Sequence, residues 1–166
     1  LYGETFTIPE GYIPPVGARI MSLQEPDHKM SKSDKNENGY IALLDPPDVI
    51  TRKFKRAITD SDTENAIRMA PEKPGVSNLI GIYSVLTNKT TEQVEQEFAG
   101  KGYGAFKPAV AEAVVETLKP IQEKYKTYLA DKAQLETLMK QGAEKAESIA
   151  RRTLRKAYKK IGFYQI

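Results

Sequence analysis

The spacing of apolar residues after position 45 constrains the fold most strongly. Apolar residues there recur three and four positions apart, which is the pattern of helices with one buried face. The first such stretch follows Asp45, Pro46 and Pro47 and has apolar residues at Val49, Ile50, Phe54, Ala57 and Ile58. Asp45 offers an N-cap, and proline suits the first helical position because its missing N–H has no intrahelical partner there. We therefore predict that a helix begins at this point.

The middle of the chain predicts two further helices. One carries apolar residues at helical spacing from position 76 to position 86, after a break at Lys73, Pro74 and Gly75. Thr90 and Gln93 have the spacing of a capping box, in which each side chain accepts a hydrogen bond from the other residue's N–H. They predict a short helix that ends near position 100.

The last third of the chain predicts two longer helices. One begins at Pro108, carries an apolar stripe as far as Tyr128 and has a kink at Pro120, because proline removes one helical hydrogen bond. The other has apolar positions from Leu135 to Thr153. The whole part of the chain after position 45 is therefore expected to form a compact bundle of about five helices.

The first 45 residues have a different texture. Proline and glycine divide them into short extended segments, ETFTIPE, YIPPVGARIMSL and YIALLD, which we interpret as strands. Nothing in this region closes a sheet by itself. The fold class is therefore expected to be mainly α, with short strands before an all-helical bundle.

The residue types that are missing exclude several kinds of site. With no cysteine and one histidine in 166 residues, the chain can have no disulfide framework, thiolate metal site or histidine-rich zinc cluster. We expect no resident metal and a reducing, cytoplasmic location. No apolar run reaches the roughly 20 residues that cross a bilayer, so no membrane is expected as a partner. The chain begins with Leu1 rather than Met, and we expect a fragment whose upstream part is missing.

Positive charge is concentrated at the end of the chain. The formal net charge of +3 is too small to mark a nucleic-acid binder. Residues 151–166, however, contain six cations and no acid. On a helix, Arg152, Arg155, Lys156 and Lys159 would lie on one face that could follow a phosphate backbone. The same charge also complements a helix dipole, so the pattern leaves a structural role open.

Residues 28–36, HKMSKSDKN, form a polar loop with two lysines three positions apart. The ammonium groups of Lys29 and Lys32 are mobile, carry three donors each and can converge on a polyphosphate. The hydroxyl groups of Ser31 and Ser33 add neutral donors. A solvated surface loop explains the same composition, and composition alone favours that alternative.

The order of the motifs resembles a known family. The string KMSKS at residues 29–33 matches the signature loop of class I aminoacyl-tRNA synthetases, and it lies between GARIMSL at residues 17–23 and the continuation SDKN. The tracts AITDSD, KPGVSNLIGIYS and GKGYGAFK are similar as well, so the resemblance covers nearly the whole chain. The ordered set resembles the bacterial-type tryptophanyl-tRNA synthetases.

This resemblance implies a reaction in two steps. The carboxylate of tryptophan attacks the α-phosphorus of ATP to give tryptophanyl-adenylate and pyrophosphate, and the tryptophanyl group then passes to tRNA(Trp). By resemblance, Lys29 and Lys32 are the candidate catalytic residues, because positioned cations stabilise the charge that builds on pyrophosphate. Together with Met30, Ser31 and Ser33 they are expected to bind ATP, whose counter-ion is Mg²⁺.

The resemblance also assigns the adenine of ATP to the main chain beside Ile20, with Met21 flanking it. Both residues can equally be core residues at the end of a strand, and the two roles are compatible. The carboxyl ends of strands are where Rossmann-type sheets place their ligands.

The resemblance divides the chain into two parts. Residues 1–45 correspond to the end of a Rossmann-type catalytic domain with its KMSKS loop, and residues 46–166 correspond to a helical domain that recognises the anticodon. The second class I signature, a HIGH-like tetrapeptide, is absent, and so is the half of the site that binds tryptophan. The chain is therefore expected to be inactive alone, and the full-length enzyme is expected to be a homodimer.

Other candidate residues have plainer explanations. His28 has no second histidine or cysteine near it and is interpreted as a loop residue. Asp60, Ser61 and Asp62 could coordinate a cation, but a turn in which they bond local backbone is the simpler interpretation. Four tyrosines could stack on bases, yet most lie on apolar stripes, where core or interface packing is favoured: Tyr83, Tyr103, Tyr125 and Tyr128.

Two alternative functions remain. A helical RNA-binding module without catalytic activity would explain the bundle and the basic end, but it would not explain GARIMSL followed by KMSKS. A tyrosine-specific class I relative shares fold and mechanism, although its loop commonly departs from KMSKS. Both rank below the tryptophan-specific function.

Overall fold

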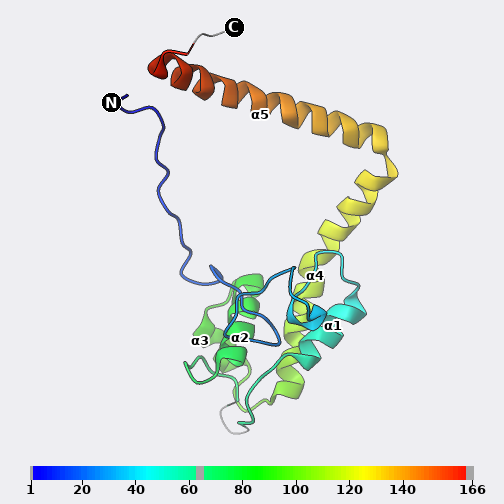
Figure 1. Cartoon of the computed structure of the whole chain (residues 1–166). Helices are drawn as coiled ribbons and strands as arrows, with labels where there is room; N and C mark the ends of the chain where they lie inside the picture. Colours follow the sequence, from blue (N-terminus) through cyan, green and yellow to red (C-terminus); the bar gives the residue numbers. More distant parts are fainter. Residues whose placement is uncertain (1, 63–65, 164–166) are drawn as a thin grey trace. The chain divides into compact units, whose positions relative to one another are not determined.

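The fold is known from a computed structural model, which describes residues 2–62 and 66–163 (Figure 1). The described residues fall into two compact units. The larger unit is Ile13–Glu123, and the terminal unit combines the chain up to Tyr12 with the chain from Lys124 onward. None of the helices in the described ranges is long and apolar enough to cross a membrane.

Five α-helices account for most of the regular structure of residues 2–62 and 66–163, which confirms the expected mainly α class and the number of helices. One 3₁₀ turn in these ranges, η1 (Glu37–Gly39), precedes them. In chain order the helices are α1 (Pro47–Arg56), α2 (Pro74–Thr87), α3 (Thr91–Glu97), α4 (Tyr103–Ala130) and α5 (Lys132–Ile161).

The start of α1 differs from the prediction in its cap. The helix begins at Pro47, but its N-cap is Pro46 and no side chain caps it, so the proposed capping role of Asp45 is wrong. The Asp45 carboxylate instead accepts from the N–H of Ala42 at 3.0 Å and from the ammonium of Lys53 at 2.7 Å. The buried Lys53 also donates to the carbonyl of Tyr40 at 3.0 Å. A buried ammonium needs an anion, and this demand determines where Asp45 points.

The capping box predicted before α3 is confirmed. The hydroxyl of Thr90 accepts from the N–H of Gln93 at 3.3 Å, and the Gln93 side chain accepts from the N–H of Thr90 at 2.9 Å. These bonds satisfy two donors that a helix start otherwise leaves unpaired. Just before them, α2 ends at Asn88 in the left-handed conformation with φ 54°.

Helix α4 begins at Tyr103, five residues before the predicted start at Pro108. Pro108 lies inside the helix, as does Pro120. Phe106 on the preceding turn is completely buried, and the ammonium of Lys107 donates to the carbonyl of Ala57 at 2.8 Å. Burial of the aromatic ring outweighs the one helical hydrogen bond that Pro108 removes.

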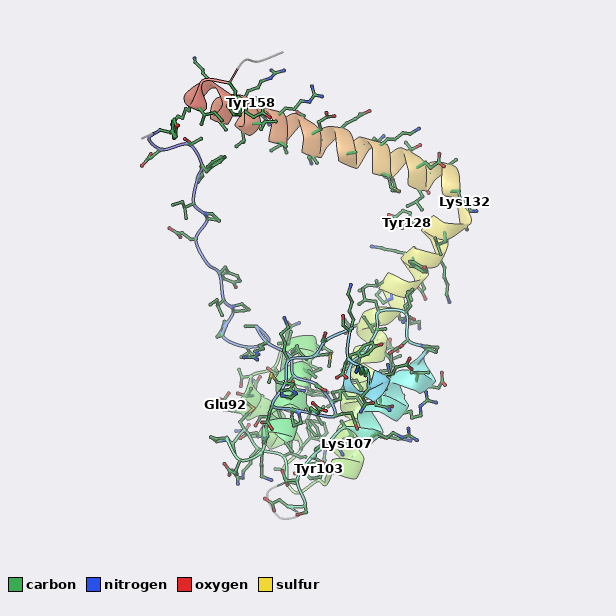
Figure 2. All side chains as sticks on the ribbon, viewed as in Figure 1. Glu92, Tyr103, Lys107, Tyr128, Lys132 and Tyr158 are labelled. Atoms are coloured by element: carbon green, nitrogen blue, oxygen red, sulfur yellow. The ribbon has the colours of Figure 1, made fainter. Side chains whose placement is uncertain are left out.

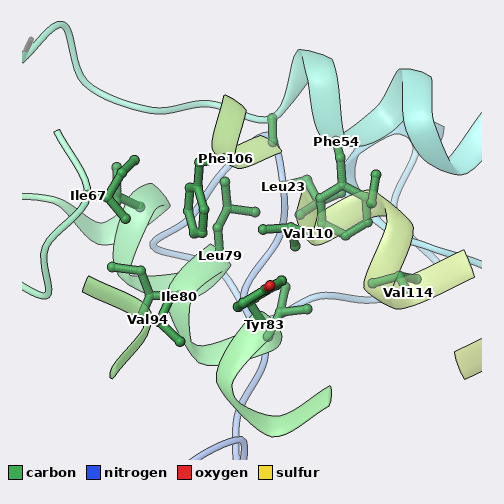
Figure 3. Packing of buried hydrophobic residues seen from close by; sticks show 14 of the residues in the cluster. Leu23, Phe54, Ile67, Leu79, Ile80, Tyr83, Val94, Phe106, Val110 and Val114 are labelled. Atoms are coloured by element: carbon green, nitrogen blue, oxygen red, sulfur yellow. The ribbon is translucent and has the colours of Figure 1, made fainter. Parts of the chain in front are cut away.

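The core of the larger unit is built by α1, α2, α3 and the first half of α4. Figure 3 shows Phe106 among aliphatic side chains of α2 and α3. Phe106 packs edge to face against Phe98 and Tyr83, with ring centroids 4.9 and 6.3 Å apart. Such aromatic pairs add to the stabilisation from burial alone. The core positions are completed by Leu23, Ile50, Phe54, Leu79, Ile80, Val94 and Val110.

The structure corrects the expectation of short strands in the first 45 residues. In the described part of this region, pairing is limited to one isolated antiparallel bridge, between Met21 and Lys29. An extended segment becomes a strand only when a neighbour satisfies its N–H and C=O groups. Segments 4–10 and 11–19 have no such ladder partner among the described residues.

Helix α5 belongs to the terminal unit and has no buried residue. Asp131 is its N-cap, and the Asp131 carboxylate accepts from the N–H of Gln134 at 2.9 Å. Gly162 is its C-cap, in the left-handed conformation. The side chains of α5 stand off the ribbon in Figure 2. The apolar stripe predicted for this helix is present but exposed. The expected compact bundle of five helices is therefore wrong for α5, and the buried α-helical residues belong to α1, α2, α3 and α4.

Two glycines of α2 provide a stability test. A Cβ at Gly75 would overlap the carbonyl oxygen of Ile58, whereas a Cβ at Gly81 would meet nothing within 4 Å. We expect Gly75→Ala to lower the free energy of unfolding by about 2 kcal/mol or more, because backbone cannot move aside as a side chain can. We expect Gly81→Ala to raise it by about 0.5 to 1 kcal/mol through helix propensity. Urea denaturation followed by circular dichroism measures both; equal effects would contradict the close approach at Gly75.

Candidate functional site

Residues 20–23, here called the anchor segment, are held by main-chain contacts on both sides. The N–H of Met21 donates to the side-chain oxygen of Asn78 at 2.8 Å, and the Asn78 side chain donates back to the carbonyl of Met21 at 2.8 Å. The N–H of Leu23 donates to the carbonyl of Gly39 at 2.9 Å, and the carbonyl of Leu23 accepts from Ile58 at 2.8 Å. The buried Leu23 side chain then fixes this segment in the core.

The KMSKS loop, residues 29–33, is attached to the anchor segment by two main-chain hydrogen bonds. The N–H of Met30 donates to the carbonyl of Ile20 at 3.0 Å, and the N–H of Ser22 donates to the carbonyl of His28 at 2.8 Å. The side chain of Met30 is half-buried and packs against the core. The loop therefore has a fixed base on the side of Met30.

The rest of the loop is a compact turn with exposed cations. The hydroxyl of Ser31 accepts from the N–H of Ser33 at 3.2 Å, and the carbonyl of Ser31 accepts from the N–H of Asp34 at 3.1 Å. Lys29 and Lys32 are exposed, and neither ammonium forms a salt bridge with any described residue. Two exposed cations three positions apart in one turn can converge on an anionic ligand.

An open groove borders the anchor segment. It has a volume of about 860 Å³ and is lined by Ile20, Met21, Ser77, Asn78 and Gly81, among others. Neither Lys29 nor Lys32 lines it. The carbonyl of Ile20 accepts from the N–H of Met30. No described residue accepts from the N–H of Ile20, so this group is left as a main-chain donor for a ligand.

Comparison with known proteins decides the family. Residues 2–119 match the family described as tRNA synthetases class I (W and Y). The chain belongs to this family of class I tRNA synthetases. It is 51% identical over 163 residues to the tryptophan–tRNA ligase of Clostridium tetani and 53% identical over 161 residues to that of Clostridium perfringens. These alignments cover 98% and 97% of this chain and 48% of each relative, so the chain spans about half the length of the curated relatives it matches.

Solved structures support the same assignment for this class I synthetase chain. The tryptophanyl-tRNA synthetase of Mycoplasma pneumoniae superimposes with a TM-score of 0.80 and 35% identity, over 91% of this chain and 45% of that one. The tryptophanyl-tRNA synthetase of Campylobacter jejuni, in a structure described as complexed with ADP and tryptophan, gives a TM-score of 0.65 at 26% identity. That alignment covers 98% of this chain and 49% of the other.

The plainer interpretation of His28 fits the structure of this synthetase chain. Its ring nitrogen Nδ1 lies 2.7 Å from a carboxylate oxygen of Glu25, and both side chains are exposed. The described residues contain no group of three or more histidine, aspartate or glutamate side chains arranged to hold a metal ion. His28 is thus a loop residue paired with a neighbouring acid.

Sequence reasoning missed a buried ionic cluster next to the turn at residues 60–62. The N–H of Asp62 donates to the Asp60 carboxylate at 2.8 Å, as expected for a turn. The ammonium of Lys73, only 3% exposed, also lies 3.0 Å from a carboxylate oxygen of each aspartate. The hydroxyl of Tyr103 donates to Asp60 at 2.7 Å. Nothing in the local sequence marks Lys73, because its partners lie 11 and 13 residues before it and Tyr103 lies 30 residues after it.

The cluster shifts the pKa of its members. Burial alone would raise the pKa of Asp60, but hydrogen bonds from Tyr103, the Asp62 backbone and Lys73 outweigh it and lower the pKa to about 2. Burial would lower the pKa of Lys73, but hydrogen bonds to both aspartates raise it. Burial and the Asp60 carboxylate raise the pKa of Tyr103 to about 12. At neutral pH the carboxylate is ionised, the ammonium is charged and the phenol is neutral.

The four tyrosines considered as base-stacking candidates separate into two groups. Tyr83 is buried in the core and Tyr103 is bonded within the ionic cluster, so packing explains both. Tyr125 and Tyr128 are 44% and 42% exposed, so they are not core residues, and interface packing stays a prediction for these two rings. Their apolar stripe lies beyond the buried part of α4, which ends at Leu118.

The basic end of the chain forms the last turns of α5. Arg152, Arg155, Lys156 and Lys159 are all exposed. The neighbouring Arg151 is paired with Glu147 one turn earlier, at 2.6 Å. These side chains are therefore at the surface, as either role predicted for them requires.

The ionic cluster makes stability dependent on acid pH. The ordinary pKa of Asp60 is 3.8 and its value in the fold is about 2, so its contribution is complete above 3.8 and is lost as the pH falls through 2. We expect Asp60→Asn to reduce the difference in unfolding free energy between about pH 6 and about pH 2.5. Urea denaturation at both pH values measures it, with the exposed Asp48→Asn as control. An unchanged pH dependence in Asp60→Asn would contradict the role of the cluster.

Proposed function

We propose that this chain supplies the KMSKS loop and the helical part of a tryptophan–tRNA ligase. The observation that carries the proposal is the pair of exposed lysines, Lys29 and Lys32, on a loop whose base is bonded to Ile20. This arrangement supports an ATP site in which adenine and phosphates are held by neighbouring parts of one segment. The substrates proposed for the full-length enzyme are ATP, tryptophan and tRNA(Trp).

In the proposed reaction the tryptophan carboxylate attacks the α-phosphorus of ATP, and pyrophosphate leaves. Lys29 and Lys32 stabilise the negative charge that accumulates on the leaving oxygens, and they act more strongly on the transition state than on bound ATP. Ser31 and Ser33 keep the turn closed through their own hydrogen bond. The N–H of Ile20 is suited to donate to a ring nitrogen of adenine.

Mg²⁺ enters this proposal with ATP as its counter-ion. Mg²⁺ binds phosphate oxygens and retains several waters rather than needing a cage of protein ligands. The lysines and the ion would share the neutralisation of the triphosphate.

Tryptophan is preferred to tyrosine as the amino acid because of the relatives. The family includes synthetases for both amino acids. The relatives at 51% and 53% identity are both named tryptophan–tRNA ligases. The proposed site residues in this chain bind ATP, so the amino acid itself would be selected by parts of the enzyme that this chain does not include.

The role of the lysines can be tested in the full-length enzyme. We expect Lys29→Ala and Lys32→Ala each to reduce ATP–pyrophosphate exchange about 100-fold, the usual effect of removing one group that stabilises transition-state charge. Wild-type exchange in both variants would refute the proposed role.

The matched control is Lys35→Ala, because Lys35 is also exposed but lies outside the KMSKS loop. Its exchange rate should stay close to that of the wild type. The 166-residue chain assayed by itself should form no tryptophanyl-adenylate, since it corresponds to only 48% of the length of its relatives.

The exposed basic turns of α5 are proposed to bind the backbone of tRNA(Trp). This assignment is supported by four exposed cations on the last turns of one helix, within residues 151–166, which contain no acid. Non-specific contacts of this kind depend on the release of counter-ions, so they weaken as salt is added. The specific residues that read the anticodon are not among those proposed here.

Charge reversal tests this surface. We expect Arg152→Glu to weaken binding of the full-length enzyme to tRNA(Trp) and to reduce the slope of log affinity against log salt by about one. Filter binding at several salt concentrations measures both quantities. Lys140→Glu, an identical charge change at an exposed position nearer the start of α5, is the control. Indifference of affinity to salt and to Arg152→Glu would leave the basic turns with a structural role only.

The remaining expectations concern the whole enzyme. We propose that it is a cytoplasmic homodimer and that its anticodon-binding domain corresponds to residues 46–166 of this chain. The boundary between residues 45 and 46 lies within the larger compact unit, and it stays a prediction about evolutionary and functional domains.

A further inference from the structure

Asn78 is a buried polar residue that the reaction as described does not use. It lies in the middle of α2 and is 9% exposed, with Leu79 and Ile80 beside it at 1% and 0%. A polar side chain at such a position costs free energy unless its hydrogen bonds are satisfied. Its partners therefore indicate why the position is polar.

Both hydrogen bonds of the Asn78 side chain go to one residue. Its oxygen accepts from the N–H of Met21 and its nitrogen donates to the carbonyl of Met21, each at 2.8 Å. A carboxamide is the side-chain group that offers an acceptor and a donor together in this geometry. The pair of bonds fixes both the position and the rotation of the Met21 backbone relative to α2.

The residues on either side of Met21 hold the KMSKS loop. Ile20 accepts from Met30, and Ser22 donates to His28. Asn78 therefore connects α2 to the base of the loop through the Met21 backbone. The connection is completed by the hydrogen bond between Met30 and Ile20 and by the one between Ser22 and His28. Among the described residues, Asn78 is the one side chain of α2 that hydrogen-bonds to residues 20–33.

The fixation by Asn78 is separate from the anchoring of the core. Leu23 is held by its own main-chain bonds to Gly39 and Ile58 and by its buried side chain. Loss of the carboxamide would therefore free the backbone at positions 20 and 21 while Leu23 stays in place. This separation allows a positioning role to be distinguished from a role in folding.

We propose that Asn78 is a positioning residue for the ATP-dependent step: it sets the register between the adenine-binding backbone at Ile20 and the phosphate-binding loop. This inference rests on the proposed function. If the Met21 backbone rotates, Ile20 and Met30 move relative to α2, and the lysines no longer reach the phosphates of an ATP whose adenine is held at Ile20. The effect is expected on ATP and not on tryptophan.

The experiment uses the full-length enzyme with Asn78→Ala, Asn78→Asp and Ser84→Ala. Ser84→Ala is the matched control because Ser84 also lies on α2, is 4% exposed and makes a buried side-chain hydrogen bond, to the carbonyl of Lys89 at 2.6 Å. Asn78→Asp keeps an acceptor for the Met21 N–H and loses the donor. ATP–pyrophosphate exchange is measured as a function of ATP and of tryptophan, together with the melting temperature.

We expect Asn78→Ala to raise the KM for ATP about tenfold, the factor that corresponds to one net hydrogen bond, and to lower kcat, with an unchanged KM for tryptophan. Asn78→Asp should lie between the wild type and Asn78→Ala. Ser84→Ala should keep the wild-type KM for ATP even if its melting temperature falls as far as that of Asn78→Ala. A wild-type KM for ATP and kcat in Asn78→Ala would overturn the inference and leave Asn78 as a structural residue.

Amide hydrogen exchange provides the second measurement, and it applies to this chain alone. The amides of Ser22 and Met30 should exchange about tenfold faster in Asn78→Asp than in the wild type, because the Met21 carbonyl loses its donor, while the α3 amide of Val94 is unchanged. Equal exchange at these amides would overturn the inference even if Asn78→Ala does not fold. A wild-type enzyme without any ATP–pyrophosphate exchange would instead refute the proposed function, and the exchange data would still show whether Asn78 holds the loop.

Discussion

The main chain of residues 20–23 lies between helices and an open groove, without a sheet to pair with among the described residues. Every buried N–H and C=O in such a segment needs a partner, and here the partners come from four different places. They are the side chain of Asn78, the turn at Gly39, Ile58 just after α1, and the KMSKS loop with the preceding His28. The loop thus does not merely follow the segment in sequence: it is one of the groups that make burial of the segment possible.

The same demand for partners explains the two buried lysines. Lys53 and Lys73 each lie in the larger unit with almost no exposure, and each is met by at least one carboxylate and one neutral oxygen. Such arrangements specify a unique geometry more than they add stability, because desolvation offsets much of the attraction. Lys53 links the last turn of α1 to residues 40–45 before it, and Lys73 links the turn at residues 60–62 to the start of α4. Helix packing alone would leave these irregular segments undetermined.

Local features of the structure were predictable from the sequence, and long-range ones were not. The capping box of Thr90 and Gln93 depends on residues three apart, so its letters suffice. The start of α4 was placed too late because Pro108 is a local signal against helix, while the burial of Phe106 is decided by α2 and α3. Asp45 was predicted to be a cap because it precedes two prolines, which is a local signal. It bonds Lys53 instead, because the fold buries the Lys53 ammonium and this group needs an anion.

The candidate site shows the same division. The letters KMSKS and GARIMSL indicated Ile20, Lys29 and Lys32, and the structure brings Ile20 and the loop together through one main-chain bond. Asn78, which holds Met21 from 57 residues away, had no signal in the pattern of α2 beyond being a polar residue in an apolar stretch. A polar position within an otherwise buried helical face would be a useful marker for such residues in other sequences.

Met30, the one apolar residue of the KMSKS loop, is the residue that attaches this loop to the core. Its side chain is half-buried in the core and its N–H is bonded to Ile20, while the residues on either side of it are exposed. Lys29 and Lys32 therefore lie on either side of the one residue of the loop that is fixed to the core. Any change in the position of the loop as a whole would have to break the Met30 hydrogen bond and expose this side chain, whereas the two lysine side chains can reorient without either cost.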